Sequence, residues 1–266
     1  MPRGGNQLAC LAAAIALVSQ VSANECKPTW QQEFDKPLDE GVWNTVEGDG
    51  CDIDLCGWGN QEKQYYHADA LEVTDGVLKI TASQDGAGQI LSGKITTAGH
   101  FSQKFGRFEA RMKLPAGRGL WPAFWMMPEG QQKPWPHEGE IDILEWTGNE
   151  PRRIIGAVHF GDGWPNNVHY SEELLTPAVW SGDYHVYGVE WSPQSIRWTV
   201  DGRVHGEANA DNIAPWNWVF DDLPFYFILN MAVGGTLGGE VVMADLPATL
   251  EVDWVRVYDG HCDRIY

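Results

Sequence analysis

Short runs of β-branched and aromatic residues, separated by turn residues, constrain the fold of this 266-residue chain more than any other feature. Residues of these types favour β-strands, and Gly, Pro, Asn and Asp end them. The pattern predicts strands over residues 77–82, 106–114, 154–160, 185–191, 196–200, 224–229 and 249–258, with a hairpin turn at Asp201-Gly202. Because no segment has the pattern of a long amphipathic helix, we expect an all-β sandwich of two antiparallel sheets, of jelly-roll type.

The first 23 residues have the layout of a secretory signal peptide. Arg3 precedes an apolar run from Leu8 to Val18, and Val21-Ser22-Ala23 supplies small residues for cleavage. The apolar run is too short to span a bilayer, and no later segment is long enough. We therefore expect a secreted protein, extracellular or periplasmic, in which residues 24–266 form a single domain.

The chain is strongly acidic, with 37 Asp and Glu against 18 Lys and Arg and a formal net charge of −19. Such a surface repels phosphate backbones and anionic lipids, so we expect neither nucleic acid nor a membrane as a partner. A neutral polymer suits this charge better than a sulfated or carboxylated one. The same acidity is typical of proteins from salty surroundings, so charge alone does not identify the partner.

Four of the five cysteines follow the predicted leader: Cys26, Cys51, Cys56 and Cys262. Cysteines of an exported protein tend to pair, and four of them allow three connectivities. We predict a Cys26–Cys262 bond that joins the two ends of the domain and a Cys51–Cys56 bond that closes a short loop. Because no Cys or His cluster has the spacing of a zinc site, we expect no zinc.

Three carboxylates lie within six residues in segment 139–146, which reads GEIDILEW. Alternate residues of a strand share a face, so Glu140 and Asp142 point the same way and Glu145, in a regular strand, the opposite way. One β-bulge would return Glu145 to their face. Three acids on one face repel each other, but they suit glycosidic bond cleavage, in which one carboxylate attacks and a protonated one donates to the leaving oxygen.

A half-exposed strand with its acids toward solvent would give the same pattern. Small and aromatic residues flank the acids, however, and a Trp-rich stretch precedes them, which favours a functional site. Glu138, two residues before Glu140, is interpreted as an acid at the rim of this site.

Further segments extend the pattern along the chain: 58–62 (WGNQE), 106–115 (GRFEARMKLP), 119–127 (GLWPAFWMM), 184–191 (YHVYGVEW), 229–235 (LNMAVGG) and 252–258 (VDWVRVY). With the acidic segment they closely resemble the laminarinase-like branch of glycoside hydrolase family 16, in the family's order and over nearly the whole chain after the leader. The resemblance implies a concanavalin A-like jelly roll with a concave cleft and no cofactor for catalysis. It assigns Glu140 as the nucleophile, Asp142 as its helper and Glu145 as the acid/base of a retaining mechanism.

The resemblance also implies substrate-binding residues. Trp121 and Trp125 lie four apart on one predicted strand and would stack on sugar rings, with core packing as the alternative. For Trp146, Trp191, Trp198 and Trp254 we expect core packing.

Polar residues at matching family positions would contact sugar hydroxyl groups: Asn60, Glu62, Arg111 and Asn230. For each of them a structural salt bridge or loop hydrogen bond is an equal alternative. His159, which closes a predicted strand beyond the acids, is expected at the cleft edge near Glu145.

One segment departs from the family. Many relatives carry Arg in a T-S-A-R-L-T-T segment, where this chain has Lys94 in LSGKITT. Lys cannot make the rigid bidentate contact of Arg, so the family's sugar preference at this position does not carry over.

A calcium ion is often bound in this family on the sheet face away from the cleft. The matching residues are Glu33, the backbone of Gly76, and Asp253, and oxygen ligands of these kinds suit Ca²⁺. The resemblance therefore predicts a structural calcium ion that braces the sandwich and takes no part in the chemistry.

The resemblance implies a monomeric endo-β-1,3-glucanase that acts on neutral, laminarin-like β-glucan. The additional residue in the acidic motif, Leu144, fits the laminarinase branch better than the branch without the bulge. Mixed-linkage β-1,3-1,4-glucan is the alternative substrate, with agar or carrageenan more distant. A non-catalytic β-glucan-recognition protein of the same fold is the alternative from another class, although such proteins typically lose the acids.

Overall fold

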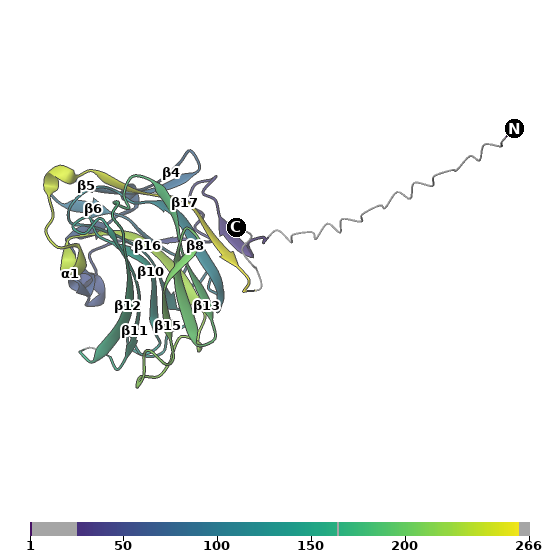
Figure 1. Ribbon diagram of the computed structural model, residues 1–266. Coiled ribbons are helices and arrows are strands. Elements are labelled where there is room, and N and C mark those ends of the chain that lie inside the picture. Colours follow the sequence, from purple (N-terminus) through teal and green to yellow (C-terminus); the bar gives the residue numbers. More distant parts are fainter. Residues whose placement is uncertain (2–25, 164, 261–266) are drawn as a thin grey trace.

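The computed structural model describes residues 1, 26–163 and 165–260. Two curved β-sheets stack face to face, which confirms the predicted all-β sandwich (Figure 1). The predicted leader and Cys262 lie outside the described residues, so the predicted domain boundaries stay predictions. None of the helices in the described part of the chain is long and apolar enough to cross a bilayer.

The larger sheet contains ten strands: β1 (Trp30–Gln32), β3 (Gln64–Tyr66), β4 (Leu71–Thr74), β5 (Val77–Gln84), β6 (Ile90–Ser92), β8 (Gly106–Lys113), β13 (Tyr184–Ser192), β14 (Ser195–Val200), β15 (Arg203–Asn209) and β17 (Ala248–Tyr258). Its order is β15-β14-β13-β8-β17-β5-β6-β3, with β1 paired to β17 and β4 paired to β5. The β3–β6 pair is parallel, and the other pairs are antiparallel.

The smaller sheet contains seven strands: β2 (Asn44–Thr45), β7 (Lys94–Thr96), β9 (Leu120–Pro128), β10 (Glu140–Trp146), β11 (Arg153–Gly161), β12 (Asn167–Leu175) and β16 (Phe225–Val233). Its order is β12-β11-β10-β9-β16-β7-β2, which places β10 in the interior of the sheet. The helices of the described chain are short: α1 (Gly235–Gly238), η1 (Cys51–Ile53), η2 (Cys56–Gly59), η3 (Ala68–Ala70) and η4 (Met243–Asp245).

Every strand predicted from the sequence overlaps a strand of the structure. The predicted hairpin is also confirmed, because Asp201 and Gly202 connect β14 to β15 with φ angles of 47° and 77°. Such left-handed backbone angles suit Asp and Gly in a two-residue turn. The turn residues thus predicted where these strands lie along the chain.

The core lies between the two sheets and follows the alternation of the strands. On β5, Leu78, Ile80 and Ala82 are fully buried, whereas the residues between them are only half-buried. Fully burying a Leu or Ile side chain contributes about 1.5–3 kcal/mol. Burial of this kind on both inner faces holds the smaller sheet against the larger one.

Trp254 is an exception among the tryptophans predicted for the core. Trp146, Trp191 and Trp198 are at most 2% exposed, as predicted. The prediction for Trp254 is wrong, because the register of β17 against β8 shifts just before it. A bulge reverses the faces of the residues that follow, so the Trp254 ring is half-buried with the Arg256 guanidinium 4.1 Å from its centroid.

Gly156→Ala should destabilise the sandwich. A Cβ at Gly156 would lie 2.3 Å from Cδ1 of Trp198, whose Nε1 donates to the backbone carbonyl of Asp142 over 2.8 Å. Overpacking of this kind should lower the free energy of unfolding by about 1–3 kcal/mol, measured by chemical denaturation. Gly86→Ala is the control, since nothing lies within 4 Å of a Cβ there; an equal loss in both variants would contradict the prediction.

Candidate active site

A β-bulge in β10 sets the positions of the three acids. Between Asp142 and Glu145 the chain advances three residues on β10 but two on β11, which is the single-residue bulge predicted from the sequence. The intervening Ile143 and Leu144 are both buried in the core. Glu140, Asp142 and Glu145 therefore share the face of the smaller sheet that points away from the core, which we call the acid face.

The first and last acids each accept a hydrogen bond from an indole. Trp135 Nε1 donates to Glu140 Oε2 over 2.6 Å, and Trp121 Nε1 donates to Glu145 Oε1 over 3.1 Å. Between them, Asp142 shares a side-chain hydrogen bond with Glu140. Glu140 and Asp142 thus form a hydrogen-bonded pair that can share a proton, whereas Glu145 accepts from the Trp121 indole.

Burial raises the pKa of all three carboxyl groups because it removes the hydration of the charged form. At Glu140 this effect is opposed by the charge of His159 and by hydrogen bonds from Trp135 and Asp142. At Asp142 and Glu145 it is reinforced by a neighbouring carboxylate, so the pKa of each rises far above its usual range. Glu140 is therefore the acid whose charged form is supported best, and Glu145 retains its proton to higher pH.

His159 supplies positive charge to this cluster. Its Nε2 lies 3.2 Å from Asp142 Oδ2, and its ring centroid lies 5.7 Å from that of Trp135. Burial lowers the pKa of His159, but the hydrogen bond to Asp142 and the charges of the three acids outweigh burial and raise the pKa to about 10. One ligand atom from each of Glu140, Asp142 and His159 lies within 4.8 Å of the others. Groups this close can share protons, and His159 contacts Asp142 rather than Glu145.

Asn60, Glu62 and Asn230 belong to one hydrogen-bond network, although Asn230 is distant in sequence from the other two. Asn60 Nδ2 donates to Glu62 Oε1 over 3.2 Å, and Tyr66 OH donates to Glu62 Oε2 over 3.3 Å. Asn230 Nδ2 donates to Tyr66 OH over 3.0 Å, and Asn230 Oδ1 accepts from Trp125 Nε1 over 2.7 Å. The structure thus joins three predicted polar residues to one of the predicted sugar-stacking tryptophans.

Trp121 and Trp125 lie on one face of β9, as their spacing predicted. Trp125 is the β-sheet partner of Asp142 and is half-buried, and the indole of Trp121 contacts Glu145. Both rings therefore lie on the acid face, but Trp121 is buried, at 9% exposed, whereas Trp125 is half-buried. Stacking of the two rings on sugar stays a prediction.

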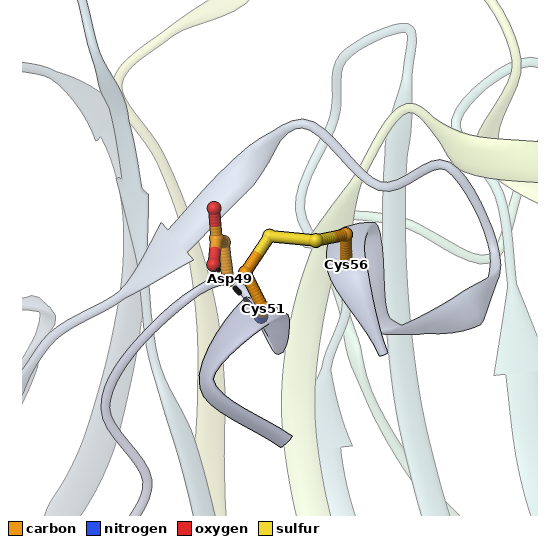
Figure 2. The surroundings of a disulfide bond; sticks show 3 residues. All are labelled: Asp49, Cys51 and Cys56. Carbon is orange, nitrogen blue, oxygen red and sulfur yellow. Dashed lines mark hydrogen bonds between the residues drawn. A yellow bond between two sulfur atoms is a disulfide. The ribbon is translucent and has the colours of Figure 1, made fainter. Parts of the chain in front are cut away.

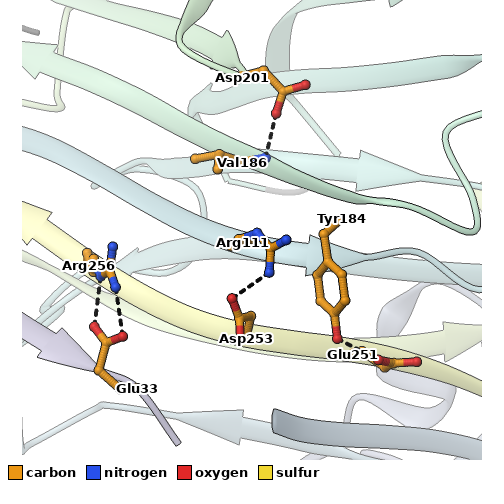
Figure 3. A network of polar contacts seen from close by, with 8 residues as sticks. All are labelled: Glu33, Arg111, Tyr184, Val186, Asp201, Glu251, Asp253 and Arg256. Carbon is orange, nitrogen blue, oxygen red and sulfur yellow. Dashed lines mark hydrogen bonds and ion pairs between the residues drawn. The ribbon is translucent and has the colours of Figure 1, made fainter. Parts of the chain in front are cut away.

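Arg111 does not lie with the acids. It is on β8 of the larger sheet, where its NH1 donates to Asp253 Oδ2 over 2.6 Å and its guanidinium lies 4.3 Å from the centroid of the Tyr184 ring (Figure 3). Its neighbours Ala110 and Met112 point into the core, so Arg111 points away from it. The prediction that Arg111 contacts sugar is wrong, because the whole core separates it from the acid face.

The carboxylates predicted to bind calcium are already paired with arginines (Figure 3). Arg256 Nε and NH2 donate to the two oxygens of Glu33, both over 2.7 Å, and Asp253 accepts from Arg111. Gly76 lies in the turn between β4 and β5, at φ 76°. A guanidinium beside each carboxylate repels a cation, so the residues present do not fit a calcium ion in this arrangement.

A disulfide closes the loop that leads toward Asn60. The predicted Cys51–Cys56 bond is confirmed, and the backbone N–H of Cys51 donates to Asp49 Oδ1 over 3.0 Å (Figure 2). Cys262 lies outside the described residues, so the predicted Cys26–Cys262 bond stays a prediction.

Two residues of the site, Trp135 and Tyr66, were missed by the sequence analysis. Trp135 lies five residues before Glu140, where its position next to the acidic motif was the only available signal. Tyr66 lies on β3, and its buried hydroxyl group needed partners that only the fold supplies. Glu138, interpreted as a rim acid, accepts from the backbone N–H groups of the exposed loop residues Gln132 and Lys133.

Comparison with known proteins gives a consistent result. The sequence profile described as glycosyl hydrolases family 16 matches residues 59–256. The chain is 40% identical over 254 residues to glucan endo-1,3-beta-glucosidase A1 of Niallia circulans, covering 86% of this chain and 37% of that protein. It is 40% identical over 251 residues to a beta-glucanase of Rhodothermus marinus, covering 86% of this chain and 84% of that protein. The X-ray structure of endo-beta-1,3-glucanase from Pyrococcus furiosus is similar with a TM-score of 0.80 and 36% identity, covering 88% of this chain and 94% of that one.

Trp135→Phe and Trp121→Phe each remove one indole donor from an acid. Because a hydrogen bond to a carboxylate favours its charged form, the pKa of Glu140 should rise in Trp135→Phe and the pKa of Glu145 in Trp121→Phe. Carboxyl ¹³C NMR titration measures both. Trp218→Phe is the matched control, since its indole donates to Asp221 and to neither of these acids. It should leave the pKa of Glu140 and of Glu145 unchanged, and a rise of either pKa in Trp218→Phe equal to that in the test variants would contradict the assignment.

Proposed function

The chain belongs to glycosyl hydrolase family 16, and from this premise we propose that it is a retaining endo-β-1,3-glucanase that hydrolyses internal bonds of laminarin-like glucans. The names of its relatives from Niallia circulans and Pyrococcus furiosus support the β-1,3 linkage. The chain spans 37% of the length of the first of these relatives, so the activity is proposed for residues 1–266 alone.

The bulge in β10 is the observation that carries the proposal. It brings Glu140, Asp142 and Glu145 to one face, with hydrogen-bond partners that differ for each acid. Double displacement needs one charged and one protonated carboxyl group on the same substrate. The acid face provides both, because Glu140 has the better supported charge and Glu145 the raised pKa.

In the first step the Glu140 carboxylate attacks the anomeric carbon, and the bond from this carbon to the leaving oxygen breaks. Glu145 gives its proton to that oxygen, which leaves a glycosyl-enzyme ester on Glu140 and a charged Glu145. In the second step Glu145 takes a proton from water, the water oxygen attacks the anomeric carbon, and Glu140 is released as a carboxylate. Two inversions at one carbon retain its configuration.

Asp142 and His159 act on the two working acids. Asp142 donates a hydrogen bond to Glu140 and lies beside the imidazolium of His159. The positive charge compensates part of the negative charge that the acids place on one strand. His159 contacts Asp142 from β11. Its role is therefore to compensate the negative charge of the acids rather than to bind sugar.

Aromatic and amide groups beside the acids suit a neutral sugar polymer. Trp121 and Trp125 offer ring faces to the apolar faces of pyranose rings, and Asn60 and Asn230 offer amide groups to hydroxyls. Glu62 is hydrogen-bonded within the network, so it orients these groups. One chain supplies all of these side chains, which supports action as a monomer.

We infer that the chain is exported. Residues 1–23 have the layout of a signal peptide, and the Cys51–Cys56 disulfide suits an oxidising compartment.

The carboxyl groups of the chain supply both the nucleophile and the acid, so the proposed reaction requires no cofactor.

Glu140→Gln should lower turnover of laminarin by about 10³-fold or more, because an amide cannot form the glycosyl ester. Binding of a laminarin oligosaccharide, measured by calorimetry, should be retained. Glu138→Gln is the matched control, since Glu138 only accepts from the loop backbone, and it should keep its activity. Loss of turnover in Glu138→Gln with activity kept in Glu140→Gln would show that the roles are assigned to the wrong acids.

Early digestion of laminarin should yield long oligosaccharides before short ones, because internal cutting shortens chains at random positions. Chromatography of timed samples measures the size distribution. Lichenan and agarose, digested in parallel, test the linkage. Absence of new reducing ends from laminarin would refute the proposed substrate, and release of glucose alone from the first sample would refute internal cutting.

A further inference from the structure

Lys94 occupies the position where the sequence departs from the family. It lies on β7 directly opposite Asn230 of β16. Its Nζ lies 4.2 Å from the centroid of the Trp58 ring and 5.2 Å from that of Trp125. Tyr66 presents a third ring, at 5.8 Å. The ammonium group is therefore enclosed by aromatic rings beside the predicted sugar platform.

Two carboxylates face this ammonium group from different elements. Glu62 precedes β3 and Glu140 begins β10, and both interact with the charge of Lys94. Within the described chain Nζ has an ion–ring contact with each aromatic neighbour but no hydrogen bond to a carboxylate. Burial lowers the pKa of Lys94 to about 8, against the opposing effect of these two charges.

Trp58 follows the disulfide-bonded Cys56 by two residues, and its ring lies over the ammonium group of Lys94. Trp58 has left-handed backbone angles, φ 52° and ψ 28°, and its N–H donates to the carbonyl of Asp49 over 3.3 Å. A non-glycine residue in this region costs free energy, so the ring remains there only because other contacts retain it. A cation near the ring face is one such contact, and it contributes about 0.5–2 kcal/mol.

We propose that Lys94 is a positioning residue, whose ammonium group fixes the spacing of the Trp58 and Trp125 rings for one sugar and supplies positive charge beside the nucleophile Glu140. The inference rests on the proposed function and adds a second aromatic wall, Trp58, to the sugar-binding face. An Arg side chain at this position would provide the same positive charge, but it would keep that charge at every pH at which Lys94 loses its own.

The sign of the pH effect follows from the two states of the side chain. Below the pKa of Lys94 the ammonium attracts both rings and favours the Glu140 carboxylate. Above it the neutral amine does neither, so glucan affinity falls as pH rises. Removing the cation leaves Glu140 with less support for its charge, so the acid limb of kcat/KM moves to higher pH.

The first experiment compares kcat and KM of wild type, Lys94→Met and Lys94→Arg on laminarin as a function of pH. Lys94→Met should move the acid limb upward by about half a pH unit and raise KM several-fold, with a smaller change in kcat. Lys94→Arg should keep the wild-type acid limb. Lys104→Met is the matched control, because Lys104 is exposed and its Nζ lies 5.4 Å from the Phe105 ring; it should change neither quantity.

The second experiment measures laminarihexaose binding in the Glu145→Gln background, which retains the charge of Glu140. Affinity should fall several-fold between about pH 6.5 and about pH 9.5 with Lys94 present, and it should stay constant with Lys94→Arg. An unchanged acid limb and unchanged affinity in Lys94→Met, in an enzyme that cuts laminarin, would overturn the inference alone.

Failure of the proposed function gives a different result, because wild type would then leave laminarin intact. Carboxyl ¹³C NMR titration of Glu140 decides the inference without any substrate. A raised pKa in Lys94→Met that Lys94→Arg restores supports the positioning role. An unchanged pKa overturns it.

Discussion

One extra residue in β10 is the constraint on which the rest of the site depends. Without it Glu145 would point into the core with Ile141, and the strand would carry only two acids on its outer face. The bulge leaves Ile143 and Leu144 buried, so the core is kept while the third acid changes sides. Placing three carboxyl groups together costs stability, and the sandwich core around them offsets this cost.

The environments of the acids, more than their number, determine the chemistry. Desolvation raises the pKa of all three, but the Trp135 indole and Asp142 support the charge of Glu140. At Glu145 the charge of Asp142 acts in the same direction as burial. A β-strand alone would give neighbouring acids similar surroundings. The difference between them comes from side chains that β9, β11 and the loop before β10 bring to the same place.

Two bulges in this chain differ in how readily a sequence reveals them. The bulge in β10 was predictable, because three acids at spacings of two and three make chemical sense only on one face. The bulge in β17 has no such signal, so Trp254 was wrongly placed in the core. Arg111 was misplaced for a related reason: its strand was predicted, but strand order assigns β8 to the other sheet. Periodicity gives the face of a residue within its strand, not the sheet to which that strand belongs.

Local sequence therefore determined the strands, the Asp201-Gly202 turn, the closure of the Cys51–Cys56 loop and the three acids on one face. These features depend on steric and chemical properties of residues that are close in sequence. Tertiary structure alone decided that Trp135 and Trp121 serve different acids, that Glu33 and Asp253 pair with arginines, and that Lys94 lies near the Trp58 and Trp125 rings. Such contacts join strands far apart in the chain, and their energies depend on burial and distance, which exist only once the sheets have packed.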